Sequence, residues 1–122
     1  MEYIISWFEI PTTNIQRAAK FYSEVLACEI GINEMNGSQM GFFPSKQGVV
    51  SGALVQVADQ LPSESGTTVY FYIEGDLTTS LNRVEAAGGQ ILQPKKHIGE
   101  GIGFCAFVKD TEGNKVALHS MG

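Results

Sequence analysis

The same order of predicted elements occurs twice along this chain of 122 residues. Each half begins with a strand pattern, continues with an amphipathic helix pattern and ends with further strand patterns. The two copies are offset by about 60 residues, a distance typical of internal repeats. The order predicts one α+β domain over residues 1–122, with two tandem β-α-β-β-β modules at about 1–58 and 67–122 and a polar linker at 59–66. On its own, this order also fits a ferredoxin-like sandwich.

The first module contains a well-defined helix pattern between strands. We expect its first strand over residues 3–10. Thr12, Thr13 and Asn14 can each cap the helix that follows, because each carries a side-chain oxygen. The helix is predicted to end near Ala27, and its apolar positions recur at three- and four-residue steps: Ile15, Ala18, Ala19, Tyr22, Val25 and Leu26. Further strands are expected around residues 29–33, 39–43 and 51–57.

The second module repeats this pattern. A strand is expected over residues 67–73, and Asp76 is placed to cap a helix that continues to Ala87. Further strands are expected at residues 90–92, 103–109 and 115–120. The glycine-rich stretch that contains His97 is predicted to be a solvated loop. The segment between the last two strands is predicted to be a hairpin turn in which Gly113 supplies a positive φ.

Composition and charge argue against several classes of protein. The formal net charge is −5, and the eight Lys and Arg residues are scattered, which disfavours a nucleic-acid-binding surface. No apolar run approaches the roughly 20 residues of a membrane span. The N-terminal segment lacks the features of a signal peptide, so a cytoplasmic location is expected. Cys28 and Cys105 are too few for a disulfide framework and are expected to be buried as small hydrophobic residues.

Two sets of residues carry a resemblance to a known family. The first is Trp7-Phe8-Glu9-Ile10-Pro11, followed by Asn14, Ile15, Arg17, Ala18, Phe21, Tyr22, Val25 and Leu26. The second is Gly75-Asp76-Leu77, then Arg83-Val84-Glu85-Ala86-Ala87-Gly88-Gly89, then Phe107 to Lys115 with its Asp-x-x-Gly-Asn hairpin. With these motifs the chain resembles the vicinal oxygen chelate family, which includes glyoxalases, bleomycin-resistance proteins and ring-cleaving dioxygenases. The resemblance covers essentially the whole chain.

The resemblance implies a shape and a kind of partner. In such proteins the paired modules form a curved sheet around a cavity, with the helices on the outer side, and many members are homodimers. A small molecule binds in the cavity, and in the metal-dependent members it does so through a divalent cation. We therefore expect a small-molecule ligand and a homodimer, and no nucleic-acid or membrane partner.

The residues at the family's metal-ligand positions have the wrong chemistry for a cation. The first-strand position corresponds to Trp7, whose indole nitrogen carries a proton and has no free lone pair. The last-strand position corresponds to Ala117, and the mid-chain position falls near residues 52–54, where there is no acid or imidazole. The remaining position falls near Thr68 or Tyr70. We therefore expect no metal at the usual site, and no other cofactor.

Strand alternation predicts which side chains of the first strand face the cavity. Phe8 and Ile10 suit packing against the helix, which turns Trp7 and Glu9 inward. His119 is expected near the same hollow. Glu9 and His119 are therefore a candidate catalytic pair for proton transfer near neutral pH. The simpler interpretations are a structural partner for Glu9 and a solvated position for His119.

The same alternation applies to the strand expected at residues 67–73. Val69, Phe71 and Ile73 are expected to pack on the second helix, so that Tyr70 and Tyr72 face the hollow. An aromatic hollow with a few hydroxyl groups is typical of a small-molecule site. The predicted ligand-binding residues are Trp7, Thr68, Tyr70 and Tyr72.

Three functions agree with these features. The first is metal-independent binding of a small molecule in the aromatic cavity. The second is a lyase or isomerase of the glyoxalase type that uses Glu9 and His119, or a cation at another position. The third is a non-catalytic interaction module. The sequence does not decide whether the protein is an enzyme.

Overall fold

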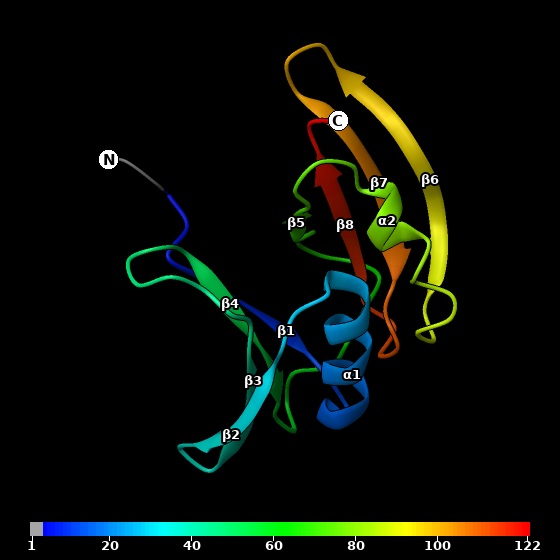
Figure 1. The fold of residues 1–122 in the computed structure, drawn as a ribbon. Coiled ribbons are helices and arrows are strands. Elements are labelled where there is room, and N and C mark those ends of the chain that lie inside the picture. The colour runs from blue at the N-terminus through cyan, green and yellow to red at the C-terminus, as the bar shows by residue number, and fades with distance from the viewer. Residues whose placement is uncertain (1–3) are drawn as a thin grey trace.

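The computed structural model describes residues 4–122 and shows two mixed four-stranded sheets with two helices (Figure 1). The first sheet has the order β1-β4-β3-β2 and the second has the equivalent order β5-β8-β7-β6. In each sheet the first strand runs parallel to the fourth, and the other pairs are antiparallel. The elements are β1 (Trp7–Pro11), α1 (Ile15–Leu26), β2 (Gly31–Met35), β3 (Ser38–Phe42), β4 (Ser51–Gln56), β5 (Tyr70–Tyr72), α2 (Thr78–Leu81), β6 (Gln90–Gly99), β7 (Gly103–Lys109) and β8 (Lys115–Ser120). The predicted α+β class and duplicated β-α-β-β-β order are confirmed.

Helix α1 follows the predicted pattern closely. Of the three candidate caps, Asn14 is the one used, because its Oδ1 accepts a hydrogen bond from the backbone N–H of Arg17 at 3.1 Å. Ala27 ends the helix in the left-handed conformation, with φ of 53°, and the N–H of Cys28 donates to the carbonyl of Ser23. Five of the six predicted apolar positions are buried: Ile15, Ala18, Ala19, Tyr22 and Val25. Leu26 is half-buried, and Phe21, which was not among the predicted positions, is buried as well.

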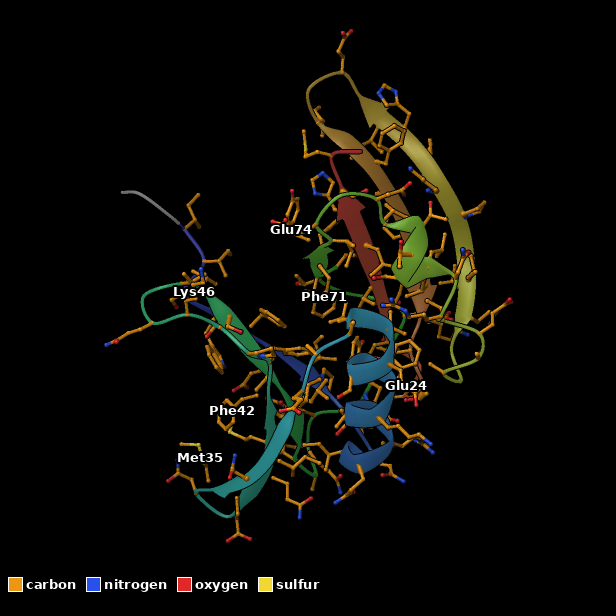
Figure 2. All side chains as sticks on the ribbon, viewed as in Figure 1. Glu24, Met35, Phe42, Lys46, Phe71 and Glu74 are labelled. Carbon is orange, nitrogen blue, oxygen red and sulfur yellow. The ribbon has the colours of Figure 1, made fainter. Side chains whose placement is uncertain are left out.

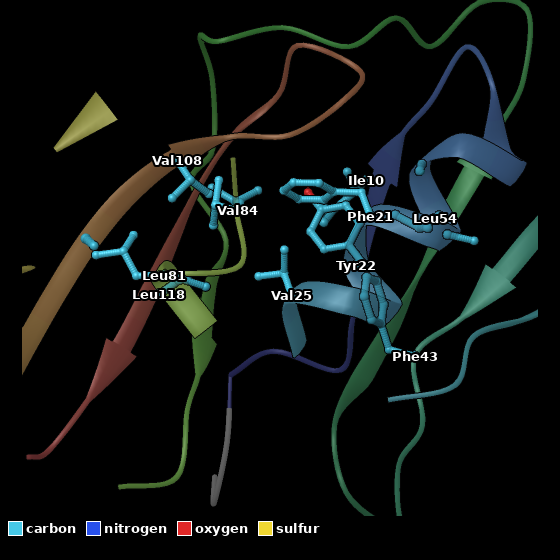
Figure 3. Packing of buried hydrophobic residues seen from close by; sticks show 14 of the residues in the cluster. Ile10, Phe21, Tyr22, Val25, Phe43, Leu54, Leu81, Val84, Val108 and Leu118 are labelled. Carbon is cyan, nitrogen blue, oxygen red and sulfur yellow. The ribbon is translucent and has the colours of Figure 1, made fainter. Parts of the chain in front are cut away.

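Buried side chains from both modules form one hydrophobic core around α1 (Figure 3). The ring of Tyr22 contacts Phe43 from the first module and Phe71 from the second, at centroid distances of 5.6 and 5.5 Å. Phe71 had been expected to pack on the second helix, but it points from β5 toward α1 (Figure 2). Each module therefore completes its core with side chains of the other.

Helix α2 is shorter than predicted. It ends at Leu81, and the chain continues to Gly88 in turns held by i→i+3 hydrogen bonds, such as the one from the N–H of Val84 to the carbonyl of Leu81. Two adjacent β-branched residues at the start of the helix, Thr78 and Thr79, lower its α-helical propensity. Leu77, Leu81 and Val84 are nevertheless buried and form the apolar face of this segment.

The segment predicted as a loop around His97 is part of a ten-residue strand, β6. Pro94 lies within this strand, which is possible because β6 is at the edge of its sheet and its outer N–H groups need no partner. One register shift occurs just before Pro94, between Ile91 and Gln93, and the next spans Pro94, between Gln93 and Lys96. The first strand also differs slightly, since β1 begins at Trp7; its expected beginning at Tyr3 lies outside the described residues.

The hairpin turn of the second module, residues 110–114, holds the first module in place, and we call it the clamp hairpin. Glu112 Oε1 accepts hydrogen bonds from the backbone N–H groups of Thr13 and Asn14, at 2.9 and 2.8 Å. Its Oε2 accepts from Arg17 Nε at 2.7 Å. A carboxylate from one module thus satisfies free N–H groups at the helix N-terminus of the other, where negative charge is favoured.

Two further residues of the clamp hairpin reach the first module and the linker. Tyr22 donates a hydrogen bond to Asp110 Oδ2 at 2.6 Å in the buried core. Asn114 Nδ2 donates to the carbonyl of Pro11, at the end of β1, and Asn114 Oδ1 accepts from the N–H of Ser63 in the linker. The clamp hairpin therefore contacts β1, α1 and the linker together, which sets the position of one sheet relative to the other.

These contacts change the ionisation of the groups involved. Burial alone would raise the pKa of Glu112, but hydrogen bonds from Arg17, Asn14, Thr13 and Thr111 outweigh it and lower the pKa to about 2. Burial, together with the charge of the neighbouring Asp110, raises the pKa of Tyr22 well above its usual value. Over the ordinary pH range Glu112 of the clamp hairpin is therefore charged, and Tyr22 of α1 is neutral.

We predict that Glu112→Gln lowers the free energy of unfolding by about 1–3 kcal/mol, because the amide keeps one acceptor oxygen and places an NH₂ group against donors. Urea denaturation measures this loss, and Glu100→Gln, an exposed site in the turn between β6 and β7, is the control. Because the pKa of Glu112 is lowered, its contribution is present above about pH 4.5 and disappears as the pH falls toward 2. Equal stability of the two variants at neutral pH would contradict the role of the clamp.

Candidate ligand-binding site

Alternate side chains of each sheet point away from the helices, and we call this side of the sheets the open face. In β1, Phe8 and Ile10 pack into the core, whereas Trp7 is 43% exposed and Glu9 is exposed. In β5, Phe71 packs into the core and Tyr70 is 53% exposed. Trp7, Glu9 and Tyr70 therefore lie on the open face.

The open face of the first sheet carries an aromatic pair above a small residue. Ala53 on β4 lies between Glu9 on β1 and Phe42 on β3 in the same row of the sheet. The rings of Trp7 and Phe42 lie 6.1 Å apart, and Phe42 points away from α1 (Figure 2). Ala53 is fully buried although it faces this side, because its larger neighbours cover it. Phe42 thus supports the indole of Trp7 from one side.

The open face of the second sheet also carries an aromatic pair. Ala117 on β8 lies between Tyr70 on β5 and Phe107 on β7, and it is fully buried. The rings of Tyr70 and Phe107 lie 6.0 Å apart in an edge-to-face arrangement. Lys115 lies over the Phe107 ring, with Nζ 4.9 Å from its centroid. In both modules, an aromatic residue of the first strand therefore lies beside a phenylalanine of the third strand. In the second module the two residues share a row with Ala117, whereas Trp7 is in the row of Ser51.

Trp7 and Tyr70 meet at a cavity of about 590 Å³ between β1 and the segment that enters β5. This volume is within the range of small-molecule sites in proteins. The lining residues are Ile5, Trp7, Phe8, Glu9, Val50, Thr67, Thr68, Val69 and Tyr70. Four of the residues singled out from the sequence, Trp7, Glu9, Thr68 and Tyr70, are thus brought to one cavity.

Tyr72 and His119 lie elsewhere. Tyr72 lines a neighbouring cavity of about 320 Å³, and its ring lies 5.8 Å from that of His119. His119 Nε2 lies 2.7 Å from the carbonyl oxygen of Ile102, so Nε2 carries the proton and donates it. Among the described residues, the cavities that Glu9 lines do not include His119. The structure does not bring the candidate acid–base pair to one cavity.

Phe42, Phe107 and Val50 were not predicted to contribute to the site. The two phenylalanines do not line the cavity themselves but contact the rings of Trp7 and Tyr70, and Val50 lines the cavity just before β4. Their strands show the required alternation, but the sequence contains no information on which strands become neighbours. Only the folded sheet identifies these partners.

Comparison with known proteins establishes the family. Residues 4–118 match the model of the Glyoxalase/Bleomycin resistance protein/Dioxygenase superfamily, so the chain belongs to this superfamily. A glyoxylase-like domain-containing protein from Didymella fabae is 30% identical over 118 residues, which span 93% of this chain and 91% of that protein. The resemblance predicted from the sequence motifs is thereby confirmed.

Solved structures agree in fold. A glyoxalase/bleomycin resistance protein from Albidiferax ferrireducens T118 has a TM-score of 0.71 and 19% identity, with 97% of this chain and 98% of that chain covered. TnmS3, an antibiotic binding protein from Streptomyces sp. CB03234, has a TM-score of 0.71 and 18% identity, with 98% and 97% covered. At such identities the likeness concerns the fold alone.

None of the helices within residues 4–122 has the length and apolar character needed to cross a membrane.

The residues of this chain do not fit the divalent cation of the metal-dependent relatives. Tyr70, rather than Thr68, pairs with Ala117, and Trp7 pairs with Ser51, just outside the expected range. The hydroxyl of Ser51 donates to the carbonyl of Phe43. These side chains offer neither carboxylate nor imidazole, which such a cation requires. Over residues 4–122, no three His, Cys, Asp or Glu side chains gather in a way that could hold a metal ion.

We predict that the purified protein contains no stoichiometric zinc, nickel, manganese or iron, because the donor atoms are missing. Elemental analysis after purification without chelators measures the metal content. Treatment with EDTA is expected to leave the melting temperature unchanged, since a bound structural or catalytic metal would stabilise the folded state. One equivalent of metal that EDTA removes, together with a fall in melting temperature, would contradict this prediction.

Proposed function

We propose that the protein binds a flat, largely apolar small molecule in the cavity between Trp7 and Tyr70, without a metal. The observation that carries this proposal is the exposure of two aromatic side chains, one from each module, at a single cavity. Contiguous exposed apolar patches often mark ligand-binding sites. A flat ligand between them would replace water on both ring faces.

The residues around the two rings support ligand binding rather than catalysis. Phe42 and Phe107 contact the two rings at centroid distances of 6.1 and 6.0 Å, and such contacts reduce the rotational freedom that a ligand would have to remove. Thr67 and Thr68 line the same cavity and offer hydroxyl groups that can donate or accept a hydrogen bond. This combination of apolar walls and a few polar groups is typical of small-molecule sites.

A member of the same fold provides an analogy. TnmS3 is described as an antibiotic binding protein, and its fold matches nearly the full length of this chain. Binding without catalysis is therefore compatible with the scaffold, although a shared fold does not transfer a ligand. The homodimer implied by the family resemblance belongs to the same proposal, and sedimentation velocity measures it.

The enzymatic alternative lacks an observation in its favour. Proton transfer by a carboxylate–imidazole pair requires both groups within reach of the same substrate. Glu9 lines the Trp7–Tyr70 cavity, whereas His119 donates to the carbonyl of Ile102 beside Tyr72. We therefore assign neither residue a catalytic role.

We predict that Tyr70→Leu weakens the binding of quinoline, a flat neutral probe, by about threefold to tenfold, because one of two stacking partners is lost. Trp7 is the single tryptophan, so its indole N–H resonance in a ¹⁵N spectrum reports directly from the cavity during the titration.

The matched control is Tyr72→Leu. Tyr72 belongs to the same strand and open face and is 57% exposed, but it lines the neighbouring cavity. We expect this variant to bind quinoline as the unmodified protein does. Equal losses in the two variants would contradict the assignment of the Trp7–Tyr70 cavity, as would a titration that leaves the indole resonance unmoved.

A further inference from the structure

The described lining of the Trp7–Tyr70 cavity carries a negative charge and no positive charge. Among the described residues that line it, Glu9 alone has a side chain that is charged at neutral pH. The ion pairs within residues 4–122 join Arg17 to Glu112, Lys95 to Asp76 and Lys109 to Glu64, and none involves Glu9. The carboxylate of Glu9 therefore lies at the cavity without a cationic partner from this part of the chain.

The sheet explains why this carboxylate is available to a ligand. Glu9 is on the open face, beside the fully buried Ala53, whose methyl group offers no hydrogen bond and fills little space. Glu9 also lines a second cavity of about 200 Å³ with Met35 and Met40, which are apolar as well. The neighbours that the two cavities place around the carboxylate thus include no Lys, Arg or His.

The aromatic walls of the cavity favour a positively charged ligand, as Glu9 does. The faces of indole and phenol rings carry negative partial charge and attract cations. Lys115, a cation on the open face of the second sheet, lies over Phe107 and is not part of the cavity lining. An anionic ligand would meet a carboxylate and two ring faces with no counter-charge, whereas a cationic ligand would be attracted by all three.

We propose that the ligand of the Trp7–Tyr70 cavity is a planar organic cation, with its ring system stacked on the two aromatic side chains and its positive nitrogen near Glu9. This inference rests on the proposed function and specifies the ligand class. The net charge of −5 favours the approach of such a ligand at low salt. This ligand class includes flat ring systems with a quaternary or protonated ring nitrogen, and flat rings that carry an amine.

Three bicyclic probes of similar size separate charge from shape: N-methylquinolinium is a cation, quinoline is neutral at neutral pH, and 2-naphthoate is an anion. The Trp7 indole resonance follows each titration. We expect N-methylquinolinium to bind about threefold to tenfold more tightly than quinoline, since a cation gains both the ring faces and an exposed carboxylate. Naphthoate is expected to bind more weakly than quinoline.

The test of the residue is Glu9→Gln, which keeps the shape and removes the charge. We expect it to reduce the affinity for N-methylquinolinium about threefold to fivefold and to leave quinoline binding unchanged. Glu34→Gln is the matched control: it removes the same charge from an exposed residue of β2, in the same sheet but outside the cavity lining. It is expected to leave the affinities of all three probes unchanged.

The outcomes separate this inference from the function on which it rests. Equal binding of quinoline and N-methylquinolinium, or a cation preference that survives Glu9→Gln, would overturn the ligand class while flat-molecule binding stands. Preferential binding of naphthoate would overturn it as well. If none of the three probes moves the indole resonance, both the ligand class and the proposed function are wrong.

Discussion

The carboxylate of Glu112 at the N-terminus of α1 is the interaction on which the arrangement of the modules depends. It lies in the second module but accepts hydrogen bonds from two backbone N–H groups and an arginine of the first. Two neighbours in the clamp hairpin, Asp110 and Asn114, extend the same connection to Tyr22 and to the end of β1. A duplicated fold whose halves share one core needs such a polar contact, because apolar packing alone has little directional preference.

The position of β1 relative to β5 follows from this connection, and the candidate site lies between these two strands. In the metal-dependent relatives, these strands and the fourth strand of each module present the ligands of a cation. Here the open face has an aromatic pair in each module, Trp7–Phe42 and Tyr70–Phe107, and the second pair lies across the buried Ala117. The same scaffold thus presents stacking surfaces in place of ligand atoms, which favours recognition of a flat molecule.

The sequence predicted the parts of the molecule that depend on local patterns. The helix at residues 15–26, the strands at 103–109 and 115–120, and the inward direction of Trp7 and Glu9 follow from periodicity and strand alternation. The extent of α2 and β6 was not predicted, because turn-type hydrogen bonds and an edge position decided them. Phe42 and Phe107 were missed since strand neighbours depend on long-range pairing, and the distance of His119 from the Glu9 cavity depends on the same pairing.

The most direct measurement is a crystal structure of the protein grown with N-methylquinolinium. The account predicts that the ring system lies between Trp7 and Tyr70 of the same chain, with the nitrogen toward Glu9. Glu112 should retain its contacts with the N-terminus of α1. A probe bound at another cavity, or Trp7 and Tyr70 separated by a different placement of the two modules, would contradict the account. A metal ion held by protein atoms beside Trp7 would contradict it equally.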